Sequence, residues 1–351
     1  MMAKASFLQI GIGIDISKDD FKVCIKGSLA TKRSKIKASS KFSNNVSGFA
    51  KFWQWQAKHL KDIEAPVEYL MEATGVYHES LAWFLYEQGA RVVVVLANRA
   101  RLFLQSEGLD SKTDKIDAQG LAQMSLVKDL RPWQPISGVL RDLKTQTRYY
   151  ASLQEDLSRS RNRLHALRHS YQASPLVMGA LKKQIRFLEK QIQSLRASIQ
   201  KTLESDPELA RKLVYLYSIK GVGLLTAAVV LAETGGFALF HSQKQLVSYA
   251  GYDVIEHQSG KYRGKTHISK KGNKYIRRIL FLPAFNALKP QGSFQDLYQR
   301  VSERTQMKMK GQVAVQRKLL CLVYTLWKKE EMFDPQKGIK KVEEPEPSYT
   351  R

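Results

Sequence analysis

The first third of the chain alternates short, continuously apolar segments with amphipathic ones. Strands are expected at residues 8–15 (LQIGIGID) and 21–27 (FKVCIKG), within 34–42, at 67–71 and at 91–96 (RVVVVL). Helices are expected after a cap at 43–47 to about 61, over 78–88, and over the segment from 114 to 128. Continuously apolar strands are buried on both faces, so this alternation predicts an α/β domain whose sheet is covered by helices.

Four carboxylates stand at notable places in this order. Asp15 ends the first strand, Glu72 follows the fourth, and Asp114 and Asp117 lie three residues apart on one face of the last helix. Carboxylate oxygens are the ligands that Mg²⁺ and Mn²⁺ prefer. A solvated or lysine-paired acid is the simpler interpretation for any one of them. All four in this order favour a site for one or two divalent ions acting on a phosphodiester.

The composition of the chain points to a polyanionic partner. The 57 Lys and Arg against 32 Asp and Glu give a formal net charge of +25. Nucleic acid is the first candidate for that partner, well ahead of a membrane surface. A length of 351 residues, 43% of them hydrophobic, suffices for two domains and a connector.

The two cysteines and the apolar runs bear on the compartment. Cys24 and Cys321 show neither CxxC nor zinc-ligand spacing, so two buried thiols in a reduced compartment are expected. The N-terminus resembles no signal peptide, and no apolar run approaches the roughly 18 residues of a membrane span. A cytoplasmic protein without a membrane partner is therefore expected.

After a boundary at Pro132–Pro135, the middle of the chain carries two heptad series. Leu or Tyr recurs every seventh residue from 143 to 171, with Leu153 and Leu167 between, and a second series runs from 181 to 199. A break is expected around Ser174, Pro175 and Gly179. The pattern predicts an antiparallel coiled-coil arm of helices about 35–50 Å long. A spacer is the simplest role, with dimerisation or RNA contact added through its arginines and lysines.

The last third opens at Asp206-Pro207 and contains a glycine turn between two apolar helices. Gly221 and Gly223 in this turn resemble a helix-hairpin-helix, whose amides can hold a phosphate. Plain packing of two helices explains the turn equally well. A closing amphipathic helix is expected over 313–327, followed by a disordered tail ending in EEPEPSYTR.

Residues 259–278 form a basic segment with eight Lys or Arg and no Asp or Glu. A solvated surface could have this composition, but the interleaved Gly, Ser, Tyr262 and Tyr275 favour contact with a nucleic-acid backbone. The expected contact residues are Lys261, Arg263, Lys265, Lys270, Lys271, Lys274, Arg277 and Arg278.

Several motifs together carry a family resemblance over about residues 8–330. These are GIDISKDDFKV, EATGVY, SEGLDSKTDKIDAQGLA, GVGLLTAAVVLAETGGFALFHSQKQLVSYAGY and HQSGKYRGKTHISKKGNKYIRRILF. In these motifs the chain resembles the DEDD transposases of bacterial insertion sequences. That family comprises recombinases guided by a bridge RNA and includes a pilin-gene invertase.

The resemblance implies a domain plan and a set of site residues. The plan is a ribonuclease H-like (RuvC-like) α/β domain over 1–131, a coiled-coil linker over 139–204, a mainly α-helical transposase domain over 206–333 and a tail over 334–351. It implies Mg²⁺, with Mn²⁺ as a substitute, at Asp15, Glu72, Asp114 and Asp117, and a nucleophilic serine at Ser259. Sequence spacing alone leaves Ser269 as a competitor, and the family pattern selects Ser259.

The resemblance also implies an activity and partners. A metal-assisted serine would attack DNA, form a phosphoserine and allow strand exchange. Donor and target DNA, a noncoding guide RNA, and a dimer that becomes a tetramer on DNA are the implied partners. Three alternatives remain: a DNA invertase of the same family, a hydrolytic RuvC-like endonuclease whose tetrad activates water, and a non-catalytic nucleic-acid-binding protein.

Overall fold

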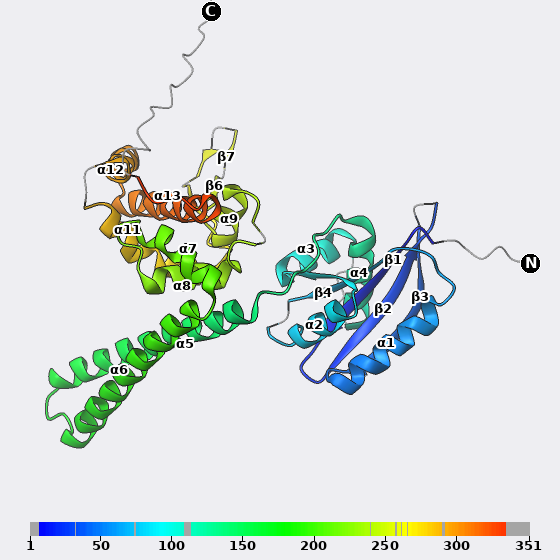
Figure 1. Cartoon of the computed structure of the whole chain (residues 1–351), viewed down its shortest axis with the longest axis horizontal. Helices are drawn as coiled ribbons and strands as arrows, with labels where there is room; N and C mark the ends of the chain where they lie inside the picture. The colour runs from blue at the N-terminus through cyan, green and yellow to red at the C-terminus, as the bar shows by residue number, and fades with distance from the viewer. Residues whose placement is uncertain are drawn as a thin grey trace, which may run out of the picture. The chain divides into compact units, whose positions relative to one another are not determined.

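The computed structural model describes residues 7–31, 33–73, 75–108, 114–238, 240–256, 258–260, 262–264, 266–289 and 292–334. The side chains of Asp114, Lys115, Gln258 and Arg263 lie outside this description. The chain divides into two compact units, the first ending at Pro135 and the second beginning at Ile136 (Figure 1).

The first unit is built on a mixed five-stranded sheet. Its strands are β1 (Gln9–Ile16), β2 (Asp20–Ser28), β3 (Ser34–Ser43), β4 (Val67–Glu72) and β5 (Arg91–Val95), in the order β3-β2-β1-β4-β5. The first three strands pair antiparallel, whereas β4 runs parallel to both β1 and β5. This order and these directions are those of a ribonuclease H-like sheet, so this part of the expectation is confirmed.

Helices cover both faces of that sheet, as the continuously apolar strands require. Helices α1 (Val46–Leu60) and α2 (Glu79–Glu87) pack on one face in a core that includes Ile12 and Phe52. Helices α3 (Ala97–Ser106) and α4 (Asp114–Val127) share a core on the other face with Leu70.

Helix α3 was not predicted. Its sequence, ANRARLFLQS, is polar on average, and it buries only Ala100, Phe103 and Leu104. This short stripe, at positions i, i+3 and i+4, is enough to seat a helix on a preformed sheet face but gives a weak periodic signal.

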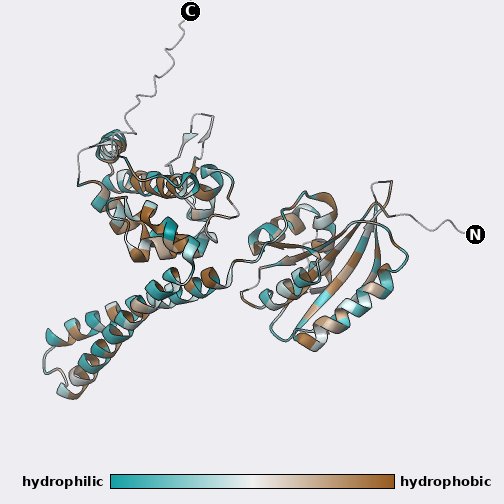
Figure 2. Cartoon of the chain, in the orientation of Figure 1, coloured by the Kyte–Doolittle hydropathy of each residue, from teal (hydrophilic) through white to brown (hydrophobic). Residues whose placement is uncertain are grey.

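The second unit begins with two long helices. Helix α5 (Gly138–Arg168) and helix α6 (Pro175–Glu204) are antiparallel, since Gln146 bonds to Thr202 and Arg161 to Glu189. Apolar and polar residues are both spread along the length of the two helices (Figure 2).

The expected break between the heptad series is wrong in detail. The turn covers residues 169–174, Tyr171 lies in it with 89% of its surface exposed, and Gly179 is inside α6. Pro175 occupies the first turn of the helix, where a missing N–H costs nothing, so it starts α6 rather than preventing it.

The rest of the second unit is mainly helical. Its helices are α7 (Pro207–Tyr217), α8 (Leu224–Thr234), α9 (Gln243–Ala250), α10 (Lys274–Ile279), α11 (Phe281–Ala287), α12 (Ser293–Thr305) and α13 (Lys308–Lys329). Short strands β6 (Val254–Ile255), β7 (Gln258–Ser259), β8 (Tyr262–Arg263) and β9 (His267–Ile268) lie between α9 and α10. The expected tail falls largely outside the described residues, which end at 334.

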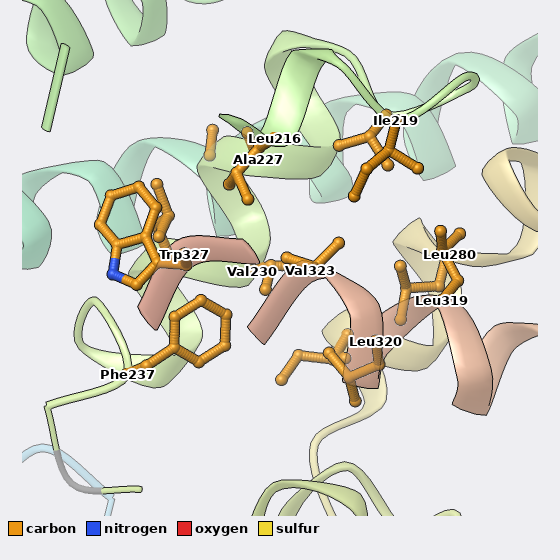
Figure 3. Close-up of a cluster of buried hydrophobic side chains, with 14 of the residues drawn as sticks. Leu216, Ile219, Ala227, Val230, Phe237, Leu280, Leu319, Leu320, Val323 and Trp327 are labelled. Atoms are coloured by element: carbon orange, nitrogen blue, oxygen red, sulfur yellow. The ribbon is translucent and has the colours of Figure 1, made fainter. Parts of the chain in front are cut away.

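One core joins these helices. Val230 of α8, Leu280, and Leu319 and Val323 of α13 are fully buried, and the ring of Phe237 lies 6.3 Å from that of Trp327 (Figure 3). Leu140 and Leu143 of α5 belong to the same core. The first turns of α5 are therefore part of the helical domain, and the remainder of the helix continues beyond it.

Two further expectations concern the burial of the two cysteines and the lack of a membrane-spanning segment. Cys24 is buried, but Cys321 is only half-buried, because it lies at the edge of the face that α13 turns to the core. None of the helices in the described residues is long and apolar enough to cross a membrane.

Candidate active site

The backbone of α4 lies directly against the backbone of β1. A methyl group at Gly13 would stand 2.1 Å from the carbonyl oxygen of Ala118, and one at Gly11 would stand 2.5 Å from that of Ala122. Both distances are far below van der Waals contact, so only glycine permits this approach. Helix α4 consequently runs antiparallel to β1, with its first turn toward the carboxyl end of the strand.

This arrangement places Asp15 beside the start of α4. Side chains alternate along a strand, so Asp15 shares the face of Gly11 and Gly13. Gly11 lies against Ala122 and Gly13 against Ala118, so two residues along the strand correspond to about one turn of the helix. Asp15, two residues after Gly13, is therefore level with the turn that precedes Ala118. That turn begins with Asp114 and contains Asp117.

Glu72 joins the same edge from the neighbouring strand. Ile14 pairs with Met71 in the parallel β1–β4 ladder, and the next residues of the two strands are Asp15 and Glu72. Leu70 packs with α3 and α4, so Glu72, two residues later, also faces α4. Asp15, Glu72 and the first turn of α4 thus meet at one edge of the sheet.

The donor set at this edge suits a hard divalent cation. Carboxylates carried by two adjacent strand ends and a helix supply the oxygen ligands that Mg²⁺ and Mn²⁺ prefer. Among the side chains that the structure describes, no group of three His, Cys, Asp or Glu is close enough to hold an ion. Asp15, Glu72 and Asp117 belong to that set, so they share one edge of the sheet without being within ligand distance of a common ion, and the side chain of Asp114 lies outside the set.

The two candidate serines lie in the second unit and differ in exposure. Ser259 is exposed on β7, where it pairs with Tyr262 of β8 across a turn containing Gly260 at φ +56°. Ser269 is half-buried after β9, and its amide donates to the carbonyl oxygen of Asp253 at 2.7 Å. Exposure makes Ser259 the more accessible hydroxyl.

The expected basic contact residues divide into three groups. Lys270, Lys271 and Lys274 are exposed. Arg277 instead donates to the carbonyl oxygen of Ala250 at 2.7 Å, and Arg278 pairs with Glu155 of α5. Lys261, Lys265 and the side chain of Arg263 lie outside the described residues.

The glycine turn before α8 packs against α11. Gly221 has φ +96°, and a methyl group there would lie 3.0 Å from the carbonyl oxygen of Pro283. Gly223 precedes α8 with open space around it. A cavity of about 520 Å³ opens beside the turn, and its polar lining includes Arg148, Gln154, Arg196, Glu233, Tyr275 and Arg278.

A buried polar network at this cavity was not predicted from the sequence. The side chain of Glu233 is fully buried, and both its oxygens accept from Arg148, at 2.7 and 3.0 Å. The side-chain amide of Asn273 donates to the same carboxylate at 2.6 Å. The Arg148 guanidinium lies 4.8 Å from the centre of the Tyr275 ring. The hydrogen bonds that Arg148 donates to Glu233 raise the pKa of Arg148 above its usual value.

This network connects the arm to the basic segment. Arg148 belongs to α5, Glu233 to α8, and Asn273 caps the amino end of α10 by accepting from the amides of Tyr275 and Ile276. A single acid inside the apolar run TAAVVLAET was the available sequence signal, because a charge rarely enters such a helix unpaired.

Comparisons with known proteins match two segments of the chain to transposase families. A transposase family model whose name carries the DEDD label matches residues 12–171, and the model of the transposase IS116/IS110/IS902 family matches residues 214–299. The chain is 29% identical over 326 residues to the pilin gene-inverting protein of Moraxella bovis, which covers 92% of this chain and 97% of that protein. A 63-residue segment is 41% identical to the transposase for insertion sequence element IS1111A of Coxiella burnetii, covering 18% of this chain and 17% of that protein.

A solved structure of Thermus thermophilus RuvC in complex with a Holliday junction substrate also matches. It covers 36% of this chain and 100% of its own, with 9% identity and a TM-score of 0.28.

Both matched segments, together more than half of the chain, belong to enzymes that recombine DNA, and the protein is accordingly a DNA recombinase of the transposase class. Within that class it belongs to the family of the IS110 transposases, which is related to the pilin gene-inverting proteins.

Proposed function

We propose that the protein is the transposase of an insertion sequence and that it cuts and rejoins DNA through a phosphoserine formed at Ser259. The observation that carries the proposal is the convergence of Asp15, Glu72 and the first turn of α4 at one sheet edge. The exposure of Ser259 on a hairpin within the second family segment supports the nucleophile.

Asp15, Glu72, Asp114 and Asp117 would hold Mg²⁺, or Mn²⁺ in its place. A bound divalent ion supplies Lewis acidity, which acidifies a nucleophilic hydroxyl and stabilises the charge of a leaving oxygen. The serine hydroxyl would give up its proton as its oxygen forms a bond to phosphorus, one phosphorus–oxygen bond to deoxyribose would break, and the released deoxyribose oxygen would take up a proton. A DNA hydroxyl reverses these steps on the phosphoserine and rejoins the strands.

The acids and the serine lie in different units of the chain, so the proposed site is composite. We assign the acids of one protomer and Ser259 of another to it, within a dimer that becomes a tetramer on DNA. The α5–α6 pair, acting as a coiled-coil arm, would hold the protomers together; the exposed pair of Arg161 and Glu189 is typical of such an arm.

The proposed nucleic-acid partners follow from the charge and the family. Donor and target DNA, together with a noncoding bridge RNA that pairs with both, would contact Lys270, Lys271, Lys274 and the glycine turn at Gly221 and Gly223. Inversion of a DNA segment is the second candidate activity. It is favoured by the similarity to the Moraxella bovis pilin gene-inverting protein over nearly the full length of both chains.

The test is to incubate the purified protein with its flanking noncoding RNA, end-labelled donor DNA and Mg²⁺, and to separate the products on a denaturing gel. A protein–DNA adduct is expected, and it should disappear in Ser259→Ala, in Asp15→Asn and in EDTA. Ser269→Ala is the matched control and should retain the adduct.

Two results would contradict parts of the proposal. Cleaved ends without an adduct, still formed by Ser259→Ala, would identify a hydrolytic endonuclease in which the acids activate water. An adduct of equal yield without RNA would remove the guide from the reaction while leaving the serine chemistry intact.

A further inference from the structure

A lysine stands directly opposite the first of the four acids. In the antiparallel β1–β2 ladder, Asp15 pairs with Lys22. Directly opposed residues of such a pair point to the same face, with their β-carbons about 4.5–5.5 Å apart. Lys22 therefore lies on the α4 face of the sheet, beside Asp15 and one strand further from Glu72.

The next residues of β2 on this face fix the position of Lys22 relative to α4. Cys24 packs with Ala118 and Ala122, and the ammonium of Lys26 bonds to the side chain of Gln123 at 3.2 Å. Moving along the strand from Lys26 to Lys22 thus moves along the helix toward its amino end. Lys22 lies at the level of the turn that carries Asp114 and Asp117.

Lys41, the residue of β3 that lies opposite Lys22, has an acidic partner of its own. Lys41 of β3 pairs with Lys22 in the ladder, but its ammonium forms an ion pair with Asp20 at 2.7 Å. Asp20 is also bonded to the hydroxyl of Ser17. The cation of Lys41 is thus balanced on the outer part of the sheet, while Lys22 stands next to the acids.

We propose that Lys22 is a positioning residue of the active site: its ammonium holds the clustered carboxylates together when no metal is bound and lowers their affinity for the ion. The inference rests on the proposed metal site. Carboxylates within a few ångströms repel one another, and a nearby ammonium reduces that repulsion. The ammonium of Lys22 repels a divalent ion bound by the same carboxylates. When the ion binds, the flexible Lys22 side chain can turn away and place its ammonium near a DNA phosphate.

The proposal is tested with full-length Lys22→Met, and Lys26→Met as the matched control on the same strand face. Two quantities are measured: the melting temperature in EDTA, and the dissociation constant for Mn²⁺ from the electron paramagnetic resonance signal of the free ion. Lys22→Met should melt about 2–4 °C lower in EDTA and bind Mn²⁺ about tenfold more tightly. Lys26→Met should not alter Mn²⁺ binding, and Lys22→Arg should resemble the wild type in both.

A second background separates a charge effect from a packing effect. In Asp15→Asn, adding Lys22→Met should no longer lower the melting temperature in EDTA, since one of the repelling carboxylates has gone. The proposal is overturned if the loss persists there undiminished, or if Lys22→Met matches Lys26→Met in Mn²⁺ affinity. If the wild type binds no Mn²⁺ but the Asp15-dependent loss remains, the pairing role stands and the metal site fails.

Discussion

Gly13 shows how one missing side chain positions the proposed catalytic acids. The strand carries no β-carbon where α4 crosses it, so the helix backbone rests on the strand backbone. The first turn of the helix, with Asp114 and Asp117, is thereby brought to the edge where Asp15 lies. The positions of the four acids could be predicted from the sequence. The role of Gly11 and Gly13 in bringing α4 to the strand could not, because both look like ordinary members of an apolar run.

Gly13→Ala is expected to destabilise the first unit and to abolish DNA cleavage. The added methyl group meets backbone atoms of α4 at 2.1 Å, and overpacking of this kind costs about 1–3 kcal/mol or more in the free energy of unfolding. Urea unfolding followed by tryptophan fluorescence measures it, because Trp53, Trp55, Trp83 and Trp133 all lie in this unit.

Gly138→Ala is the matched control, since a methyl group at this first residue of α5 would meet no atom within 4 Å. It should leave the urea midpoint unchanged or raise it slightly. Equal midpoints for the two variants would show that the close approach of α4 to β1 is not required.

Among the elements, α8 is unusual in burying a carboxylate within an almost wholly apolar helix. All of Thr226–Thr234 is buried, and Glu233 is compensated by residues of two other helices. Local patterns predicted α8, α13 and the five strands of the sheet, because α8 and most of the strands are apolar runs and α13 is amphipathic. They could not predict α3 or the partners of Glu233, which are determined by contacts between segments distant in sequence.

Arg148→Ala should lower the free energy of unfolding of the second unit by about 3 kcal/mol, because it leaves a buried carboxylate without its cation; this is the low end for a buried pair, since the Arg148 side chain is itself 45% exposed. Arg148→Met with Glu233→Gln should recover much of that loss, giving a large coupling in a double-mutant cycle. Urea unfolding followed by circular dichroism at 222 nm provides the measurement.

Arg161 and Glu189 form the control pair, with the same 2.7 Å separation but exposed side chains. Removing Arg161 should cost no more than about 1 kcal/mol. Similar losses at the two pairs would mean that the Arg148–Glu233 contact is solvated rather than buried.

The whole molecule carries a charge of +25, yet only part of that charge is available to a nucleic acid. Arg277 and Arg278, two of the expected phosphate contacts, both bond within the protein, although the side chain of Arg278 stays 48% exposed in its ion pair. Net charge is visible in a composition, whereas the distribution of that charge between internal contacts and open surface depends on the folded chain.

Replacing Lys270, Lys271 and Lys274 by Ala should reduce the salt dependence of DNA binding. Each phosphate contact contributes about 0.9 to the slope of log affinity against log salt, so the slope should fall by about 2–3. Fluorescence anisotropy over a range of KCl concentrations measures it.

The control removes the same charge from α1 and its C-cap through Lys51, Lys58 and Lys61, which are also exposed. Its slope should change by less than about 1. A matching decrease in the two triple variants would indicate attraction by total charge alone.

Helix α5 has a mechanical consequence. It is unbroken from Leu140, inside the helical core, through Arg148 to its far end at Arg168. The segment beyond Arg148 is about 30 Å long, so a tilt of about 10° at its base would sweep its tip through about 5 Å. The helix is thus a stiff rod attached to the domain at Arg148 through Glu233 and, two turns further on, at Glu155 through Arg278. A displacement at the tip would load both contacts and, through Asn273, the cap of α10.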